Sequence, residues 1–210
     1  MTNHATTRAI TLYHAAPSRS SGVLTLLEAL SADYRLERLD LRAGDSLSPA
    51  FLAINPMGKV PTIVHDGVVV TEQTAIYQYL AELYPEAGLA PAPGDALRGP
   101  FLRWLAFYGA CFEPAVTDIV MKREPAPRMT SPYADAHTVL DVVEAQLAKG
   151  DYILGDALSA ADFLWGSALG WVSAFGVFTP GPATAAYIDR MGTLAAFDRS
   201  RQIDAELVAA

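Results

Sequence analysis

Hydroxyl side chains gather in the turn between the first expected strand and the first expected helix. Tyr13 ends the strand segment, and Ser18 and Ser20 follow in the turn. A hydroxyl that donates to an anion stabilises it by about 1.5–3 kcal/mol, and a helix N-terminus adds up to about 2 kcal/mol in favourable geometry. Arg19 adds positive charge beside these donors. The turn can therefore hold an anion, although serines at this position also serve as helix caps.

A second group of polar residues surrounds the start of a later strand and helix. Glu72 and Gln73 open an expected helix, whose free N–H groups suit a carboxylate, and Gln73 can donate its amide hydrogens there. Glu72 can meet an ammonium group or complement the helix dipole. Val60 precedes Pro61 at a strand start, where backbone groups can be left free to pair, but the residues alone favour an ordinary strand-starting trans-proline. Lys59 can pair with a further carboxylate, or is an ordinary exposed turn lysine.

The first half of the chain reads as an α/β layer. Residues 10–14 alternate in hydrophobicity as a strand does, apolar residues recur at helical spacing over 23–30, and residues 34–41 read as a second strand. Strand, helix and strand at this length predict a βαβ unit with parallel strands. A short helix is expected from Ser48 to about Asn55, because serine followed by proline is a good helix start.

The clearest local signal is a β-hairpin over residues 60–70, with Asp66-Gly67 as its tight turn. Thr71 closes it and can cap a helix over 72–84. Residues 85–94 are rich in proline, glycine and alanine, as interdomain connections are. The expected boundaries are an α/β domain over residues 1–86, a linker over 87–94 and an all-helical domain over 95–210.

The second half shows helical patterns without a convincing strand. Helices are expected over 101–120, over 133–149 and from 183 to about 199. Ser159 and Asp162 have the spacing of a capping box ahead of an apolar helix. An aromatic stripe follows one face of the first of these helices, at the four-residue spacing of one helix face. Its members are Trp104, Tyr108 and Phe112.

Composition excludes several classes of protein. Hydrophobic residues make up 51% and charged residues 18%, which excludes a disordered chain. The formal net charge of -8 argues against nucleic acid as a partner. The histidines are scattered in the sequence, so no metal site is expected. They are His4, His14, His65 and His137.

The sequence also predicts where the protein works. Cys111 is the sole cysteine, so no disulfide framework can form and a reducing, cytoplasmic setting is the simplest interpretation. Residues 1–8 are polar and lack the apolar region of a secretory signal. No apolar run has the length that a membrane span needs. We expect a protein without a membrane partner.

Three segments resemble the cytosolic glutathione transferase superfamily. Residues 55–61, Asn-Pro-Met-Gly-Lys-Val-Pro, look like the family segment N-P-x-G-x-V-P, and residues 71–76 look like T-E-S-x-A-I, with Gln73 where serine is usual. Residues 158–162 look like the capping box of the family's C-terminal domain. The matches lie in order and at familiar spacing along nearly the whole chain. They imply a thioredoxin-like α/β domain with a mixed sheet, followed by an all-α domain, in a bacterial, serine-type or related class.

The resemblance implies glutathione as a substrate and assigns residues to it. Family members pair the cysteine backbone of glutathione with the residue before a cis-proline, here Val60 before Pro61. Gln73 and Glu72 would meet the γ-glutamyl carboxylate and ammonium, and Lys59 the glycyl carboxylate. The positive potential of Arg19 would help the thiolate.

The resemblance also implies a catalytic hydroxyl that stabilises the glutathione thiolate. Serine-type transferases place their serine four residues before a common arginine, and Ser18 has this spacing to Gly22, where that arginine is missing. Ser20 is an alternative, and Tyr13 matches the place that tyrosine-type classes use. Because the turn lacks cysteine, a mechanism through a protein thiol is not expected.

The implied activity is glutathione transfer to a hydrophobic electrophile or glutathione-dependent peroxidase chemistry, as in detoxification. The aromatic stripe would line the electrophile pocket, although such stripes more often belong to a core. Alternatives are a non-catalytic binding or regulatory protein, or a glutathione-dependent isomerase, dehalogenase or disulfide reductase. The family usually forms homodimers, and we expect one here.

Overall fold

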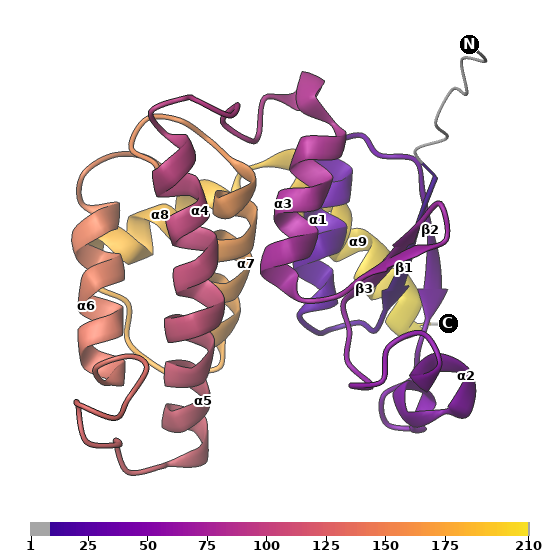
Figure 1. Cartoon of the computed structure of the whole chain (residues 1–210), viewed down its shortest axis with the longest axis horizontal. Helices are drawn as coiled ribbons and strands as arrows, with labels where there is room; N and C mark the ends of the chain where they lie inside the picture. Colours follow the sequence, from indigo (N-terminus) through magenta and orange to yellow (C-terminus); the bar gives the residue numbers. More distant parts are fainter. Residues whose placement is uncertain (1–8, 210) are drawn as a thin grey trace. The chain divides into compact units, whose positions relative to one another are not determined.

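The computed structural model describes residues 9–209 of the 210-residue chain, so residues 1–8, whose polar composition was noted above, lie outside the described part. Contacts divide the chain into two compact units (Figure 1). The first unit contains the chain up to Ala87 together with residues from Ala195 onward, and the second spans Gly88–Leu194. This division differs from the boundaries expected from the sequence, because the last helix lies with the first unit.

The first unit is built on a four-stranded mixed sheet in the order β2-β1-β3-β4. Its strands are β1 (Ile10–His14), β2 (Tyr34–Arg38), β3 (Thr62–His65) and β4 (Val68–Val70). β1 pairs with β2 in parallel and with β3 antiparallel, and β3 and β4 form the hairpin. The predicted βαβ unit and the predicted hairpin are confirmed.

The two faces of β1 have different neighbours. Leu12 and His14 are fully buried, and His14 meets side chains of α1 (Ser20–Ala29) and α9 (Ala195–Ala209). On the opposite face, the Tyr13 ring packs on Phe51 of α2 (Pro49–Leu52), with centroids 5.3 Å apart. One face of the strand is thus covered by long helices and the other by α2.

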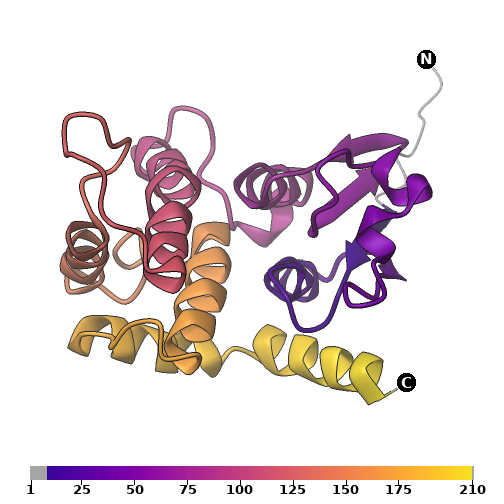
Figure 2. The same ribbon diagram turned by 90° about the horizontal axis from the view of Figure 1, so that it is seen from below.

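The first unit also contains the helix α3 (Gln73–Leu83) and two short 3₁₀ turns. α3 packs on α1, and both lie beside the sheet in two perpendicular views (Figure 2). Two short 3₁₀ turns, η1 (Asp45–Leu47) and η2 (Pro85–Ala87), complete the unit. α1 buries an apolar face because its leucines and Val23 recur at helical spacing.

The expectation of one final helix from 183 to about 199 is wrong. The structure has α8 (Pro182–Gly192) in the second unit and α9 in the first, separated by a short break at residues 193 and 194. α9 packs on α1, and the hydroxyls of Thr25 on α1 and Ser200 on α9 lie 2.7 Å apart. The helix is divided because of tertiary packing: α9 buries one side against α1 of the first unit.

The second unit is entirely helical over its described elements, as predicted. It contains α4 (Arg98–Phe107), α5 (Glu113–Met121), α6 (Ala136–Leu147), α7 (Ala160–Ala174) and α8. A π-helical turn, η3 (Tyr108–Phe112), joins α4 to α5, where the sequence predicted one regular helix. The capping box of Ser159 and Asp162 at the start of α7 is confirmed. Across residues 9–209, none of the helices combines the length and apolar character of a membrane span.

Candidate functional site

Strand pairing brings several of the predicted site residues to one end of the sheet. Tyr13 of β1 is paired with Thr62 of β3, so the turn after β1 and the segment before β3 are neighbours. The start of α3 lies at the same place, because Gln73 Nε2 donates to the Arg19 carbonyl at 3.5 Å. The N-termini of α1 and α3 therefore both supply positive potential at this end.

The segment before β3 has a backbone shape that its glycine permits. Gly58 has φ +60°, and a Cβ at this position would lie 2.8 Å from the Ser46 carbonyl oxygen. Asn55 holds the next residues, since its Nδ2 donates to the Lys59 carbonyl at 2.9 Å and to Thr62 Oγ1 at 3.0 Å. These contacts explain why asparagine and glycine stand at these places ahead of the strand.

The same segment carries three of the predicted binding residues. The Val60–Pro61 peptide bond is cis. Pro61 is buried, Val60 is half-buried and Lys59 is exposed, so the Lys59 ammonium is accessible to a ligand carboxylate. These positions are compatible with the predicted pairing of a peptide at Val60.

Glu72 has an unusual backbone conformation at the start of α3. Its φ is 63° and its ψ is 117°, a region that residues other than glycine seldom adopt. Its side chain is exposed, and its carbonyl accepts the first helical hydrogen bond, from Ile76 N at 2.9 Å. Such backbone outliers cluster at ligand sites, so the geometry favours a binding role over simple dipole complementation.

Ser18 lies just before the first residue of α1 and, like Ser21, is partly open to solvent. It is half-buried, and its Oγ accepts from the Ser20 backbone N–H at 3.1 Å. Ser18 Oγ also lies 2.8 Å from Ser20 Oγ. The Ser18 oxygen therefore caps the first N–H of α1 and is at the same time joined to a second hydroxyl.

The two alternative hydroxyls have different surroundings. Ser20 is 0% exposed, so its Oγ is out of reach of a ligand. Tyr13 lies on the other face of β1, against Phe51. Of the three, Ser18 is thus the half-buried hydroxyl that lies at the start of α1.

The aromatic stripe of the second unit belongs to its core. Each of its three members is 2% exposed or less, and their rings pack around the fully buried Trp165. Trp165 Nε1 donates to the Trp104 carbonyl at 3.2 Å. This placement corrects the expectation of an electrophile pocket lined by Trp104, Tyr108 and Phe112, because their surfaces are already used in packing against one another.

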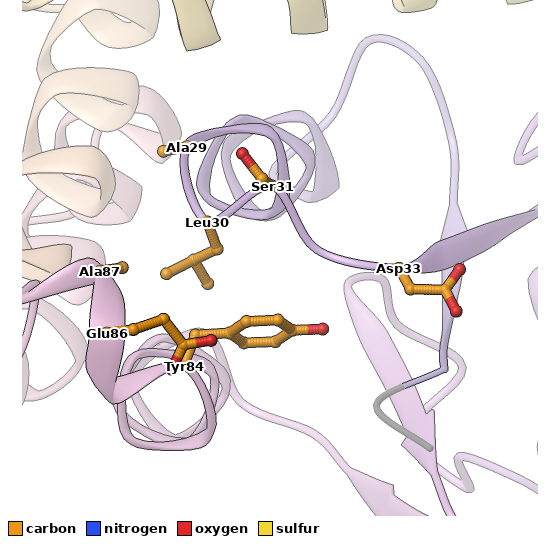
Figure 3. A pocket seen from close by; sticks show the side chains of 7 residues that line it. All are labelled: Ala29, Leu30, Ser31, Asp33, Tyr84, Glu86 and Ala87. Carbon is orange, nitrogen blue, oxygen red and sulfur yellow. The ribbon is translucent and has the colours of Figure 1, made fainter.

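A surface pocket of about 530 Å³ lies at the other end of α1. Figure 3 shows Leu30 and the Tyr84 ring facing each other across it. Two carboxylates, Asp33 and Glu86, line it, and its seven lining residues include no lysine, arginine or histidine. This pocket does not suit glutathione, which carries two carboxylates, so the Ser18 end remains the candidate site.

Sequence reasoning missed two residues near Ser18. His14 Nδ1 lies 2.8 Å from Ser20 Oγ, and its Nε2 lies 2.9 Å from Asp204 Oδ1 on α9. A histidine on the buried face of a strand was the available signal, because such a position calls for polar partners. In the described part of the chain, no group of three or more histidine, cysteine, aspartate or glutamate side chains could hold a metal ion.

Comparison with known proteins supports the family that the sequence motifs resemble. The profile of the glutathione S-transferase N-terminal domain matches residues 8–82, and that of the C-terminal domain matches residues 133–190. Glutathione S-transferase F10 of Arabidopsis thaliana is 33% identical over 157 residues, covering 69% of this chain and 72% of the relative.

Solved structures resemble the fold over most of its length. A glutathione transferase from Methylococcus capsulatus str. Bath has a TM-score of 0.80 and 30% identity, over 93% of this chain and 98% of the other. A sphingomonad glutathione S-transferase complexed with glutathione has a TM-score of 0.77 and 27% identity, with the same two coverages. The mixed sheet with its helices and the helical unit define a thioredoxin-like transferase fold. The chain belongs to the glutathione S-transferase family.

Proposed function

We propose that this protein is a glutathione transferase that activates the thiol of bound glutathione with the Ser18 hydroxyl. The observation that carries the proposal is the position of Ser18, half-buried at the start of α1 and next to the segment that contains Val60. Glutathione lies with its cysteine backbone against Val60 and its γ-glutamyl end at the start of α3. Glu72 and Gln73 bind that end, Lys59 binds the glycyl carboxylate, and Arg19 adds positive potential.

The free energies are sufficient for thiol activation. Lowering the pKa of a thiol from about 8.5 to about 6.5 requires roughly 2.7 kcal/mol of preferential stabilisation of the thiolate. The N-terminus of α1 supplies up to about 2 kcal/mol, and a hydroxyl that donates to an anion supplies about 1.5–3 kcal/mol. The helix N-terminus alone falls short and the hydroxyl alone barely reaches this value, whereas together they suffice, and Ser18 stands where both act.

The second substrate is an electrophile that the thiolate attacks, either an organic electrophile in conjugation or a peroxide. Conjugation forms a carbon–sulfur bond: an aryl halide loses halide with its electron pair, whereas an epoxide opens to an alkoxide and an unsaturated carbonyl compound gives an enolate, each of which takes up a proton. With a peroxide, the thiolate displaces the alcohol from the O–O bond and becomes a sulfenic acid, and a second glutathione converts it to glutathione disulfide and water. A panel of aryl halides, epoxides, unsaturated carbonyl compounds and organic peroxides identifies the class. We further propose a homodimer in the cytoplasm, and sedimentation equilibrium tests the oligomeric state.

Calorimetric titration with glutathione, followed by ultraviolet difference spectroscopy at neutral pH, tests the proposal. We expect saturable binding and the absorbance of a thiolate, whereas S-methylglutathione should bind without that absorbance. Failure to bind at millimolar glutathione would indicate an interaction protein that has lost the ligand. Binding without thiolate absorbance would indicate a non-catalytic glutathione-binding protein.

A further inference from the structure

Ser18 is the outer end of a hydrogen-bonded chain that runs into the first unit. Ser18 Oγ lies 2.8 Å from Ser20 Oγ, and Ser20 Oγ lies 2.8 Å from His14 Nδ1. His14 Nε2 lies 2.9 Å from Asp204 Oδ1. Its residues come from three elements and one turn, since His14 ends β1, Ser18 lies in the turn before α1, Ser20 opens α1 and Asp204 belongs to α9.

Burial isolates the middle of the hydrogen-bonded chain from water. Ser20 and His14 are 0% exposed, whereas the Asp204 side chain is 16% exposed and Ser18 is half-buried. A buried imidazole that gains a proton needs a paired anion, and Asp204 is in contact with it. Arg38 of β2, which is paired with His14 in the sheet register, is also charged, and it is exposed.

The donors and acceptors can be assigned for a neutral imidazole. The Asp204 carboxylate accepts from His14 Nε2–H, which leaves Nδ1 as the acceptor for the Ser20 hydroxyl. Ser20 Oγ accepts from the Ala15 backbone N–H at 3.1 Å, and its second lone pair accepts from the Ser18 hydroxyl. Every hydroxyl proton then points inward, so the outer lone pair of Ser18 is the acceptor for a proton from the ligand side.

We propose that this chain is a proton relay in which His14, supported by Asp204, takes up the proton of the glutathione thiol through Ser20 and Ser18. The inference rests on the proposed function, because it requires glutathione beside Ser18. His14, Asp204 and Ser20 act through Ser18 and are positioning residues, and Ser18 alone contacts the sulfur.

The step balances without another reactant. The S–H bond breaks and its proton bonds to Ser18 Oγ, the former Ser18 proton moves to Ser20 Oγ, and the former Ser20 proton moves to His14 Nδ1. The products are a thiolate, two neutral serines and an imidazolium ion beside the Asp204 carboxylate. Ser18 now directs its hydroxyl proton at the sulfur, which is the arrangement that stabilises the thiolate. When the thiolate has reacted, the proton returns along the same path and leaves to water.

The relay and direct loss of the thiol proton to solvent predict different numbers of protons released when the thiolate forms. We expect wild-type protein to form thiolate near neutral pH without net proton release, because the thiol proton stays on His14. Calorimetry in buffers of different ionisation enthalpy measures the release, and S-methylglutathione corrects for protons from other groups of the ligand. Release of about one proton per thiolate would overturn the relay in the wild-type protein.

Variants locate the proton acceptor. We expect His14→Gln to release about one proton for each thiolate it still forms, and Asp204→Asn to lower the ratio of thiolate to thiol at neutral pH about tenfold, which is equivalent to one pKa unit. Ser200→Ala is the matched control, since it removes another buried bond between α9 and α1 without touching the relay. Its thiolate fraction and proton inventory should equal those of the wild type.

Two failures are distinguishable. A wild-type protein that binds no glutathione, or binds it without thiolate, overturns the proposed function and the relay with it. Thiolate in the wild type that is lost in Ser18→Ala but unchanged in Asp204→Asn and His14→Gln overturns the relay alone. If His14→Gln does not fold, the wild-type inventory and Asp204→Asn still decide.

Discussion

Glu144 on α6 caps the start of α8 through Thr184. Glu144 Oε2 accepts from the Thr184 backbone N–H at 2.9 Å and from the Thr184 hydroxyl at 2.6 Å, and Oε1 accepts from Ala183 N at 2.8 Å. Burial by itself would raise the pKa of Glu144, but these hydrogen bonds outweigh it and hold the pKa below its ordinary value. One carboxylate thus satisfies N–H groups that α8 cannot satisfy itself.

We expect Glu144→Ala to lower the free energy of unfolding by about 1–2 kcal/mol, the usual loss for a helix cap. Because the pKa of Glu144 is lower in the folded state, its contribution is complete above the unfolded pKa of about 4.3 and is lost as pH falls through the folded value. Urea unfolding between neutral pH and pH of about 3 measures both effects. An alanine variant with the same acid sensitivity as the wild type would contradict this role.

The Ser18 hydroxyl should account for much of the catalytic rate. We expect Ser18→Ala to lower kcat/KM about ten- to a thousand-fold, as removal of one donor to an anion does, with a smaller change in the glutathione Kd. Tyr13→Phe is the comparison variant, because it removes the alternative hydroxyl and keeps the ring that packs on Phe51. An unchanged rate in the Ser18 variant, with a loss in Tyr13→Phe, would move the assignment to the tyrosine.

Gln73 should contribute to affinity for glutathione. We expect Gln73→Ala to raise the glutathione Kd about 5- to 20-fold, because a hydrogen bond to a charged carboxylate is worth about 1–2 kcal/mol after desolvation. Gln78→Ala on the same helix is the matched control, since Gln78 bonds Glu82 on the exposed side. Isothermal calorimetry compares them, and equal affinities would remove Gln73 from the site.

Gly58 should be necessary for the segment before β3. We expect Gly58→Ala to cost about 2 kcal/mol or more, because alanine is strained at φ +60° and its Cβ would meet the Ser46 carbonyl at 2.8 Å. Gly67→Ala isolates the backbone effect, since φ is +77° there and nothing lies within 4 Å. Thermal unfolding of both variants separates strain from collision, and equal losses would show that the collision is relieved.

Asp162 should be among the most sensitive positions of the helical unit. It is 0% exposed and accepts from Ile153 N at 2.7 Å, from Ser159 N at 2.8 Å and from the Tyr187 hydroxyl at 3.0 Å. We expect Asp162→Ala to cost about 3–5 kcal/mol, because it leaves several buried donors unpaired. Tyr187→Phe removes one donor and should cost about 1 kcal/mol by urea unfolding, so similar losses in both would contradict the assignment.

Local signals predicted the parts of the fold whose neighbours are close in sequence. The hairpin with its Asp66-Gly67 turn and the capping box at Ser159 each depend on a few adjacent residues, and both are confirmed. The boundary of α9 was missed because its buried residues, Phe197 and Ser200, give little apolar periodicity. A helix of that kind shows its buried side only when its packing partner is known.

The candidate site likewise has residues that local sequence patterns predicted and contacts that they could not indicate. The motifs around Val60 and Gln73 were visible in the sequence, because the segments that hold them are short and the glycine and proline are diagnostic. The contact of His14 with Asp204 joins residues 190 positions apart, which no local pattern can indicate. The aromatic stripe misled because a helical spacing is the same whether a face is packed or open to a ligand.

The return of α9 to the first unit has a consequence for synthesis. A ribosome completes residues 9–87 long before it reaches 195–209, so the early chain has to wait with the α9-facing side of α1 uncovered. A nascent chain arrested before Ala195 should accordingly bind chaperones or be cut by protease in its first segment. The first unit can therefore be completed only after the second unit has been synthesised.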